Sequence, residues 1–371
     1  MNIDDILGIA FKINASDIHL RVGRPPIYRI NGKLKPITDL PPLTVDDINL
    51  IANKVLSDQK KKQLREKLEV DYSYGIKGIG RYRVNFFFQR GSLSAVFRTI
   101  PGEIPTIEEL NLPLIIKKIA MEERGLILVT GITGSGKSTT LAAMINHINN
   151  NKQAHVITIE DPIEFLHKDK KCLINQREVG TDTLSFANAL RAALRQDPDI
   201  ILVGEMRDYE TVETALEAAE TGHLVLSTLH TLNAKETINR IVSMYPPHHQ
   251  QQIRIQLAGV LKGIISQRLI PRKDGKGRVP ACEILRTSAR VRDCIINKDK
   301  TGDIEDAMIQ GHVTHGTQTF DMSLLELYEK GLISYEEALK NADKPDDFAL
   351  KASGITDTSD VIQKDNEITK F

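Results

Sequence analysis

The chain has 371 residues with 49 Lys/Arg and 49 Asp/Glu, a formal net charge of zero, and 41% hydrophobic residues. This composition is typical of a folded protein of about two or three domains, and it gives no bulk electrostatic attraction to nucleic acid. Three cysteines without a Cys-x-x-Cys pair exclude a disulfide framework and a four-cysteine zinc site. The acidic start MNIDDILGIA is unlike a signal peptide, and no apolar run approaches the roughly 20 residues of a membrane span. We expect a cytoplasmic protein that has no nucleic-acid partner and reaches a membrane only through another protein.

The first hundred residues, 1–100, predict a small α+β domain. Apolar residues at helical spacing predict a helix over 3–13, Thr44 caps a second expected helix that runs to residue 56, and 60–68 is a charged, exposed helix. Alternating segments bounded by glycine or proline predict short strands at 18–22, 27–30, 72–74, 81–89 and 92–100. Proline and glycine then mark a linker over 101–112.

Residues 113–340 predict an α/β domain, because helices alternate with short buried strands. The expected strands are 126–130, 156–160, 200–203 and 224–228. Such alternation favours a largely parallel sheet. After Pro271 the pattern becomes mostly helical, and the polar residues 341–371 are expected to form a flexible tail.

A phosphate-binding loop is expected at 131–138, where GITGSGKS matches the pattern GxxxxGK[ST]. Glycines let backbone N–H groups approach a polyphosphate, Lys137 supplies a charge for the β and γ phosphates, and Ser138 is a ligand for Mg²⁺. A strand precedes the loop and a helix follows it, and the N-terminus of that helix also favours anions. The expected nucleotide-binding residues are Gly131, Thr133, Gly134, Ser135, Gly136, Lys137, Ser138 and Thr139.

Two further strands end in carboxylates, in the sequences EDPIE and GEMRD. Ligands of open parallel sheets bind at the carboxyl ends of strands, so both groups are expected near the nucleotide. Glu205 is expected to act through water, on the metal or on the attacking water, since Gly204 stands where a Walker B motif often has Asp. Glu164 is the competing general base, and Glu160 joins Ser138 and Glu205 as a candidate metal ligand. The alternative for each is a solvated loop acid or a helix cap.

Two histidines flank the expected strand at 224–228. His230 follows the strand at its carboxyl end, so its side chain is a candidate for contact with the γ-phosphate. His223 precedes the strand, where a coupling or interface role is favoured. A structural role is the alternative for both, because histidine forms many kinds of hydrogen bond.

The zero net charge conceals an asymmetry, since residues 1–100 carry 17 Lys/Arg and 10 Asp/Glu, a net of +7, and the rest sums to −7. Arg81 and Arg83 alternate on one side of a strand, and Arg98 lies in the same basic domain. These arginines form either a solvated face or a surface for something anionic. An arginine supplied in trans accelerates phosphoryl transfer by about 10³–10⁵.

Four motifs occur in a fixed order: GITGSGKS at 131–138, TIEDPIE at 158–164, DPDIILVGEMRD at 197–208 and TGHLVLSTLHT at 221–231. In this set the chain resembles the secretion ATPases of the type II and type IV pilus superfamily, and within them the twitching-motility retraction ATPases. The resemblance implies a PAS-like N-terminal domain, a RecA-like P-loop ATPase domain, the cofactors ATP and Mg²⁺, and a homohexameric ring.

The same resemblance implies roles for single residues. Glu205 and Glu164 correspond to essential acids, and His230 corresponds to a phosphate-sensing residue. Three N-terminal arginines reach the nucleotide or an adjacent interface: Arg81, Arg83 and Arg98. Arg240 has a related interface role. The implied partner is an inner-membrane pilus platform protein of the PilC type, which would hold the enzyme at the inner face of the cytoplasmic membrane.

The subgroup follows from what the sequence lacks. Pilus assembly and type II secretion ATPases usually add a longer N-terminal region and a four-cysteine insertion, so retraction is favoured here. Retraction ATPases commonly carry the segment AIRNLIRE, whereas residues 290–297 read RVRDCIIN and match only at Arg292 and Ile295. An assembly or type II secretion ATPase and an accessory, paralogous retraction ATPase remain the alternatives.

Overall fold

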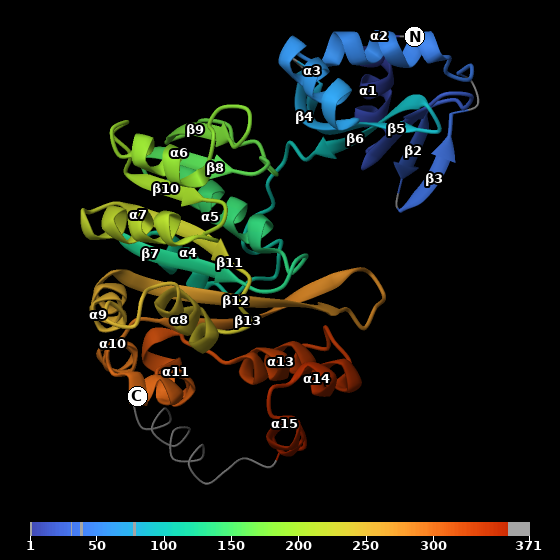
Figure 1. Ribbon diagram of the computed structural model, residues 1–371. Helices are drawn as coiled ribbons and strands as arrows, with labels where there is room; N and C mark the ends of the chain where they lie inside the picture. The colour runs from blue at the N-terminus through green and yellow to red at the C-terminus, as the bar shows by residue number, and fades with distance from the viewer. Residues whose placement is uncertain (1, 31, 38–39, 77–78, 355–371) are drawn as a thin grey trace. The chain divides into compact units, whose positions relative to one another are not determined.

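The computed structural model describes residues 2–30, 32–37, 40–76 and 79–354, and it divides the chain into two units (Figure 1). The N-terminal unit comprises Met1–Ile104 together with Pro162–His167, and the large unit comprises Pro105–Asp161 and Lys168–Phe371. Among the described residues, no helix is both long and apolar enough to cross a membrane.

The N-terminal unit is a six-stranded antiparallel sheet with helices on one face (Figure 1). Its strands in spatial order are β3 (Lys33–Pro36), β2 (Ile27–Ile30), β1 (Asp17–Arg21), β6 (Ser92–Ile100), β5 (Gly80–Gln89) and β4 (Glu69–Ile76). Its helices are α1 (Ile3–Lys12), α2 (Val45–Val55) and α3 (Asp58–Lys67). The apolar sides of α1 and α2 share one core with the inward side chains of the strands, because alternate strand residues point to opposite faces.

The large unit contains a seven-stranded sheet that is parallel except for one edge strand. The strands in spatial order are β13 (Arg278–Arg286), β12 (Leu261–Pro271), β7 (Gly125–Thr130), β11 (Leu224–Leu229), β10 (Ile200–Val203), β8 (His155–Glu160) and β9 (Leu173–Glu178). The central strands are continuous apolar runs, as expected for strands that are buried on both faces. The structure confirms the predicted α/β class with a smaller α+β N-terminal unit.

Helices cover both faces of this sheet. One core lies under α4 (Ile115–Ala120) and α5 (Lys137–Asn151). The other lies under α6 (Phe186–Ala193), α7 (Tyr209–Glu220), α8 (Ala234–Ser243), α9 (Gln250–Val260), α10 (Ala289–Ile296) and α11 (Ile304–Gln310). The chain continues through η1 (Lys298–Asp303), α12 (His312–His315), α13 (Phe320–Glu329), α14 (Tyr335–Asn341) and α15 (Pro345–Ala352).

After Pro271 the chain is mostly helical, as expected, although its first element is β13, whose residues pair antiparallel with β12. The expectation for the tail is wrong in part. The expected flexible tail contains α15, whose Phe348 is 1% exposed and packs in one apolar cluster with α13 and α14. The remaining tail, 355–371, lies outside the described residues.

Candidate functional site

The predicted site residues of the large unit gather at one edge of its sheet. Strands β7, β8, β10 and β11 are parallel neighbours, so their carboxyl ends share that edge. The loops that follow them carry the phosphate-loop motif, the acids after β8 and β10, and His230. The carboxyl edge of a doubly wound sheet is the usual place for a ligand.

The phosphate loop needs glycine at particular positions. Gly131 has φ 136°, and a Cβ there would lie 2.5 Å from the carbonyl oxygen of Gln267. Gly134 and Gly136 have φ of 78° and 95°, in the region that side chains disfavour. Gly136 ends the loop, and α5 begins at the next residue.

Lys137 lies inside the loop that it follows. Its side chain is buried, with 9% exposure, and its Nζ donates to the carbonyl oxygens of Gly131 at 2.8 Å and Ile132 at 3.1 Å. Such contacts hold the ammonium at the centre of the loop, where a phosphate could exchange for the carbonyl groups.

The loop fits a polyphosphate by two further observations. Among the described residues, no side chain caps the N-terminus of α5, so its first N–H groups face the loop. Ser135 is buried, and its Oγ has no hydrogen-bond partner in that part of the chain. Ser138 and Thr139 are half-buried in the first turn of α5, and Thr133 is exposed.

Glu205 is the centre of a charged cluster after β10. Its Oε2 lies 2.7 Å from Nη2 of Arg207, and its Oε1 lies 3.1 Å from Nε2 of His230. Burial raises the pKa of Glu205, but the hydrogen bond from Arg207 and the charges of His230 and Arg207 outweigh burial and leave the pKa below its usual value. The structure therefore brings together two predicted residues and adds Arg207, which the sequence analysis missed although it stands two positions after Glu205.

Gly204 has a steric reason to be glycine. A Cβ at this position would lie 3.1 Å from the carbonyl oxygen of Ile159 on β8 and 3.4 Å from a ring carbon of Phe186. The hydroxyl of Thr228 also donates to the Gly204 carbonyl at 2.7 Å. An Asp, as in a common Walker B motif, would meet the neighbouring strand here.

The acids after β8 differ in their surroundings. Glu160 Oε1 accepts hydrogen bonds from Thr158 Oγ1 at 2.6 Å and from Gln176 Nε2 at 3.1 Å. Glu164 is exposed and lies in Pro162–His167, the segment that belongs to the N-terminal unit. Within the large unit, the acid that contacts His230 is therefore Glu205, whereas Glu164 belongs to the other unit.

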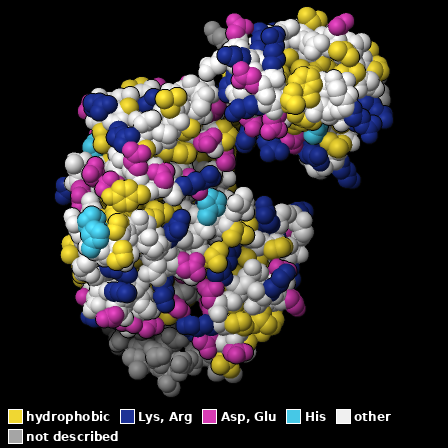
Figure 2. All heavy atoms as spheres, in the orientation of Figure 1, with side chains coloured by type: hydrophobic (Ala, Val, Ile, Leu, Met, Phe, Trp, Pro, Cys, Tyr) yellow, Lys and Arg dark blue, Asp and Glu magenta, His cyan; other side chains and the backbone are white. Residues whose placement is uncertain are grey.

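The predicted arginines lie on two units. In the N-terminal unit, Arg83 and Arg98 are direct cross-strand partners, and Arg98 Nε donates to Asp17 at 2.8 Å. Arg81 lies two residues before Arg83, on the same face of β5. Figure 2 shows Lys and Arg side chains at several places on the visible surface of this unit. Arg240 is exposed on the last turn of α8. Contact between these arginines and a nucleotide stays a prediction.

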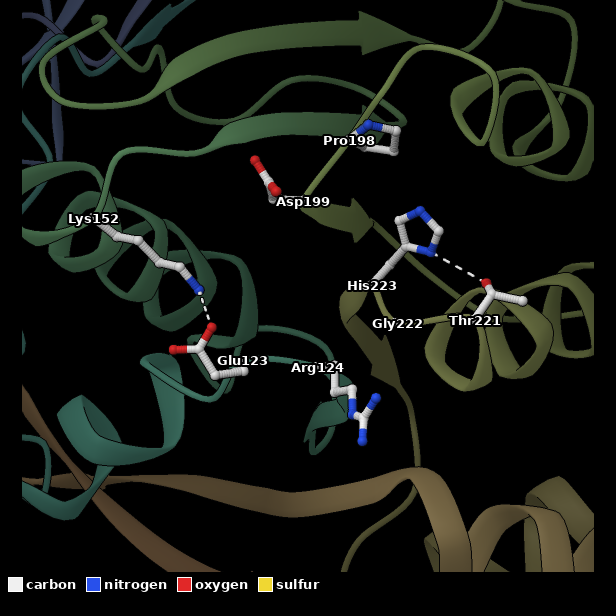
Figure 3. A pocket seen from close by; sticks show the side chains of 8 residues that line it. All are labelled: Glu123, Arg124, Lys152, Pro198, Asp199, Thr221, Gly222 and His223. Carbon is white, nitrogen blue, oxygen red and sulfur yellow. Dashed lines mark hydrogen bonds and ion pairs between the residues drawn. The ribbon is translucent and has the colours of Figure 1, made fainter.

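His223 lies at the opposite edge of the large sheet, where a hollow of about 350 Å³ opens at the amino ends of the strands (Figure 3). Its Nδ1 lies 2.9 Å from the carbonyl oxygen of Ala218 and 3.2 Å from Thr221 Oγ1. Lys152 and Glu123 form an ion pair of 3.1 Å in the same hollow. His223 is therefore apart from the phosphate loop, as its place before the strand predicted.

A divalent metal at this site would need ligands from the nucleotide as well as from the protein. Among the described residues, no group of three or more His, Cys, Asp or Glu is arranged to hold a metal ion. Mg²⁺ commonly takes one or two protein ligands and completes its shell with phosphate oxygens and water, and the phosphate loop with Ser138 suits that mode. The expected ligands Ser138, Glu160 and Glu205 stay predictions.

The fold and this edge together define a P-loop nucleotide hydrolase. A conserved-family model described as Type II/IV secretion system protein matches residues 106–302. PilT of Pseudomonas aeruginosa, named a type IV pilus retraction ATPase, is 49% identical over 94% of this chain and 100% of its own length. A crystal structure of the pilus retraction motor PilT with bound ADP aligns with a TM-score of 0.86 and 50% identity, over 94% of this chain and 98% of its own.

The paralogous type IV pilus ATPase PilU of the same organism is 41% identical over 94% of this chain and 91% of its own length. These matches span nearly all of both chains. The chain belongs to the type II/IV secretion ATPase family, as an ATP hydrolase of the pilus-retraction group.

Proposed function

We propose that the chain forms a homohexameric, Mg²⁺-dependent ATPase motor that drives type IV pilus retraction and twitching motility. The observation that carries the proposal is the alignment over the full length of a relative named for retraction. A mechanical cycle requires a nucleotide that makes different contacts in the open and closed states of the motor.

Each residue of the site then has a role. The backbone N–H groups of residues 131–139 hold the phosphates, and Lys137 neutralises charge on the β and γ phosphates. A bound Mg²⁺ would supply charge neutralisation on the phosphates; Ser138 would hold it, and Glu160 and Glu205 are the acids proposed to act on it through water. His230 would report the γ-phosphate to Glu205 through their 3.1 Å contact.

Glu205 is our preferred group for orienting or deprotonating the attacking water. Its lowered pKa keeps the carboxylate ionised at neutral pH, so it can accept a proton or a hydrogen bond from water. Glu164 is the alternative base, and it would act only when its segment lies beside the phosphate loop.

The proposed assembly places Arg81, Arg83, Arg98 and Arg240 at the nucleotide or at an interface between subunits. The motor would act on an inner-membrane platform protein of the PilC type and would be peripheral to the cytoplasmic membrane through that partner. A paralogous retraction ATPase is a second proposed partner.

One observation favours a second candidate function, that of an accessory retraction ATPase. The segment that differs from AIRNLIRE forms α10, which buries Val291, Cys294 and Ile295 and exposes Arg290 and Arg292. Its divergence therefore changes the exposed face as well as the packed one, and a relative named type IV pilus ATPase PilU is 41% identical.

Deletion of the gene, followed by complementation with the wild-type chain or with Lys137→Ala, tests the function. We expect the deletion strain to keep or increase its surface pili and to lose twitching, and only the wild-type chain to restore motility. Loss of pili on deletion would replace retraction with assembly. Unchanged twitching on deletion, with motility lost only when a paralogue is also deleted, would favour the accessory role.

A further inference from the structure

A row of polar side chains crosses the apolar sheet directly beneath the proposed catalytic loops. Register places Glu283 of β13 opposite Ser266 of β12, Ser266 opposite Thr130 of β7, and Thr130 opposite Leu229 of β11. Thr130 immediately precedes the phosphate loop, and Leu229 immediately precedes His230. The row therefore includes the last residue before the phosphate loop and ends at the last residue before His230.

Hydrogen bonds join the row into one chain. Thr130 Oγ1 donates to Ser266 Oγ at 3.1 Å, and Ser266 Oγ donates to Glu283 Oε1 at 3.2 Å. The same carboxylate oxygen accepts the backbone N–H of Ala234, the first residue of α8, at 2.6 Å. Helix α8 follows the His230 loop, so one carboxylate holds the helix that ends this loop and, through Ser266, the strand that enters the phosphate loop.

The buried surroundings of Glu283 are energetically unfavourable for a carboxylate. Glu283 is 6% exposed, and Thr130 and Ser266 are fully buried. Two residues along the same face, Leu128 on β7 and Leu285 on β13, are apolar. Burial of an acid is unfavourable unless its hydrogen bonds compensate, so the bonds from Ala234 and Ser266 are what make Glu283 tolerable at this position.

We propose that Glu283 is a positioning residue for ATP hydrolysis, which fixes the phosphate loop and the His230 loop relative to each other through Ser266 and the N-terminus of α8. This inference rests on the proposed roles of the phosphate loop and His230. Glu283 touches neither the nucleotide-binding residues nor Glu205 in its hydrogen bonds, so its effect is on geometry. A misplacement of about 1 Å between reacting groups can lower a rate about 10²-fold.

The test compares full-length variants in ATPase kinetics and in binding of a fluorescent ATP analogue. We expect Glu283→Ala to lower kcat at least tenfold while the Kd for the analogue changes less than threefold. Glu283→Gln keeps an oxygen acceptor for Ala234 and Ser266, and we expect it to restore kcat to within about threefold of the wild type.

Ser266→Ala supplies a milder break if Glu283→Ala does not fold, since it cuts the link to Thr130 and leaves the bond to Ala234. Ser227→Ala is its matched control, because Ser227 is also fully buried on the sheet and its hydroxyl bonds only to a backbone oxygen, that of Val203 at 2.7 Å, among its described contacts. We expect a lower kcat in Ser266→Ala than in Ser227→Ala at similar melting temperatures.

Several results would overturn the positioning role: equal kcat in both serine variants, wild-type kcat in folded Glu283→Ala, or a Gln variant as slow as the Ala variant. Lys137→Ala is measured in parallel. If the wild type hydrolyses ATP and Lys137→Ala does not, the proposed function of the loop stands whatever Glu283 does.

Discussion

Glu205 has a cationic or potentially cationic neighbour on each of its two oxygens, Arg207 on one and His230 on the other. This arrangement leaves the carboxylate ionised and fixed in direction, both of which a water-orienting group requires. A phosphate that attracts the His230 ring would therefore alter the hydrogen bonding of Glu205.

The first prediction concerns this acid. Glu205→Gln keeps the size of the side chain and removes its charge, so we expect kcat for ATP to fall about 10²–10⁴-fold while nucleotide affinity is kept. Steady-state ATPase assays and titration with a fluorescent nucleotide measure the two effects. Glu210→Gln, an exposed acid on α7 paired with Arg191, is the control and should keep its activity. Normal turnover in folded Glu205→Gln would remove Glu205 from the mechanism, and a large loss in Glu164→Gln alone would assign the base there.

The second prediction concerns pH. The pKa of Glu283 is raised from an ordinary value of 4.5 to about 7, chiefly by burial; the hydrogen bonds from Ala234 and Ser266 act against burial, and the charges of Asp343 and Arg268 make smaller contributions of opposite sign. The folded state therefore holds this proton more tightly than the unfolded state, and its contribution to stability is lost as pH rises from about 4.5 to 7.

Glu283→Gln does not titrate, so comparison with it isolates the carboxyl group. We expect the free energy of unfolding of the wild type, relative to Glu283→Gln, to fall by an amount on the order of 3 kcal/mol between pH 4.5 and pH 7.5. Urea unfolding at a series of pH values measures the difference. A difference that stays constant or grows with pH would show that the carboxyl group is ionised throughout.

At the scale of elements, the close approach of β8 and β10 controls where Glu205 stands. Gly204 lets the end of β10 lie against Ile159 and Glu160, and the next residue then projects from the sheet edge. The absence of a side chain at Gly204 therefore allows the close approach of β8 and β10 beside Glu205.

The third prediction follows from that contact. Gly204→Ala should lower the free energy of unfolding by about 1–3 kcal/mol and reduce kcat, because the new methyl group must push the strands apart. Gly259→Ala is a matched control, since Gly259 lies in α9 with open space around it. We expect that change to stabilise the protein by about 0.5–1 kcal/mol. Thermal melts and ATPase assays on both variants decide the matter, and equal behaviour of the two would show that β8 is not tightly apposed.

The elements that the sequence predicted are those with a strong local pattern. The four central strands are unbroken apolar runs, and the phosphate loop combines a fixed spacing with a strand before it and a helix after it. The structure of 113–340 could be anticipated to that extent.

The missed elements lack such a pattern. Strand β12 begins at the residue directly after α9, with no loop between the two elements, and β13 is an edge partner whose pairing depends on β12. Helix α15 has one fully buried residue, Phe348, in eight, so its helical spacing is faint. Glu283 could not be recognised in the sequence ACEIL, because its importance depends on a register across three strands.

At the scale of the whole molecule, the neutral chain is divided between a basic first hundred residues and an acidic remainder. The cross-strand pair Arg83 and Arg98 gives the N-terminal unit a cationic row next to Asp17. Like charges directly opposite each other on a sheet are unfavourable, and in this unit Asp17 at 2.8 Å from Arg98 and Asp71 at 3.9 Å from Arg83 offset the repulsion.

The fourth prediction is made for the assembled ring. If Arg83 serves the site of a neighbouring subunit, Glu205→Gln and Arg83→Ala subunits should complement each other when mixed. Random mixing at equal amounts would rebuild about a quarter of the sites, whereas each variant alone is inactive. ATPase activity of the mixture measures this, with Arg65→Ala, an exposed arginine on α3, as the control that stays active alone. Activity no greater than the mean of the separate variants would place Arg83 in the site of its own subunit or outside the site.

The assignment of Pro162–His167 to the N-terminal unit has a consequence for hybrid proteins. The polypeptide passes between the two units three times, after Ile104, after Asp161 and after His167. An N-terminal unit transplanted from a relative as one continuous segment would meet six residues of foreign origin, Glu164 among them. Chimeras between retraction ATPases should therefore work best when the exchange includes both stretches, so a functional exchange in this region needs two separate segments of the gene.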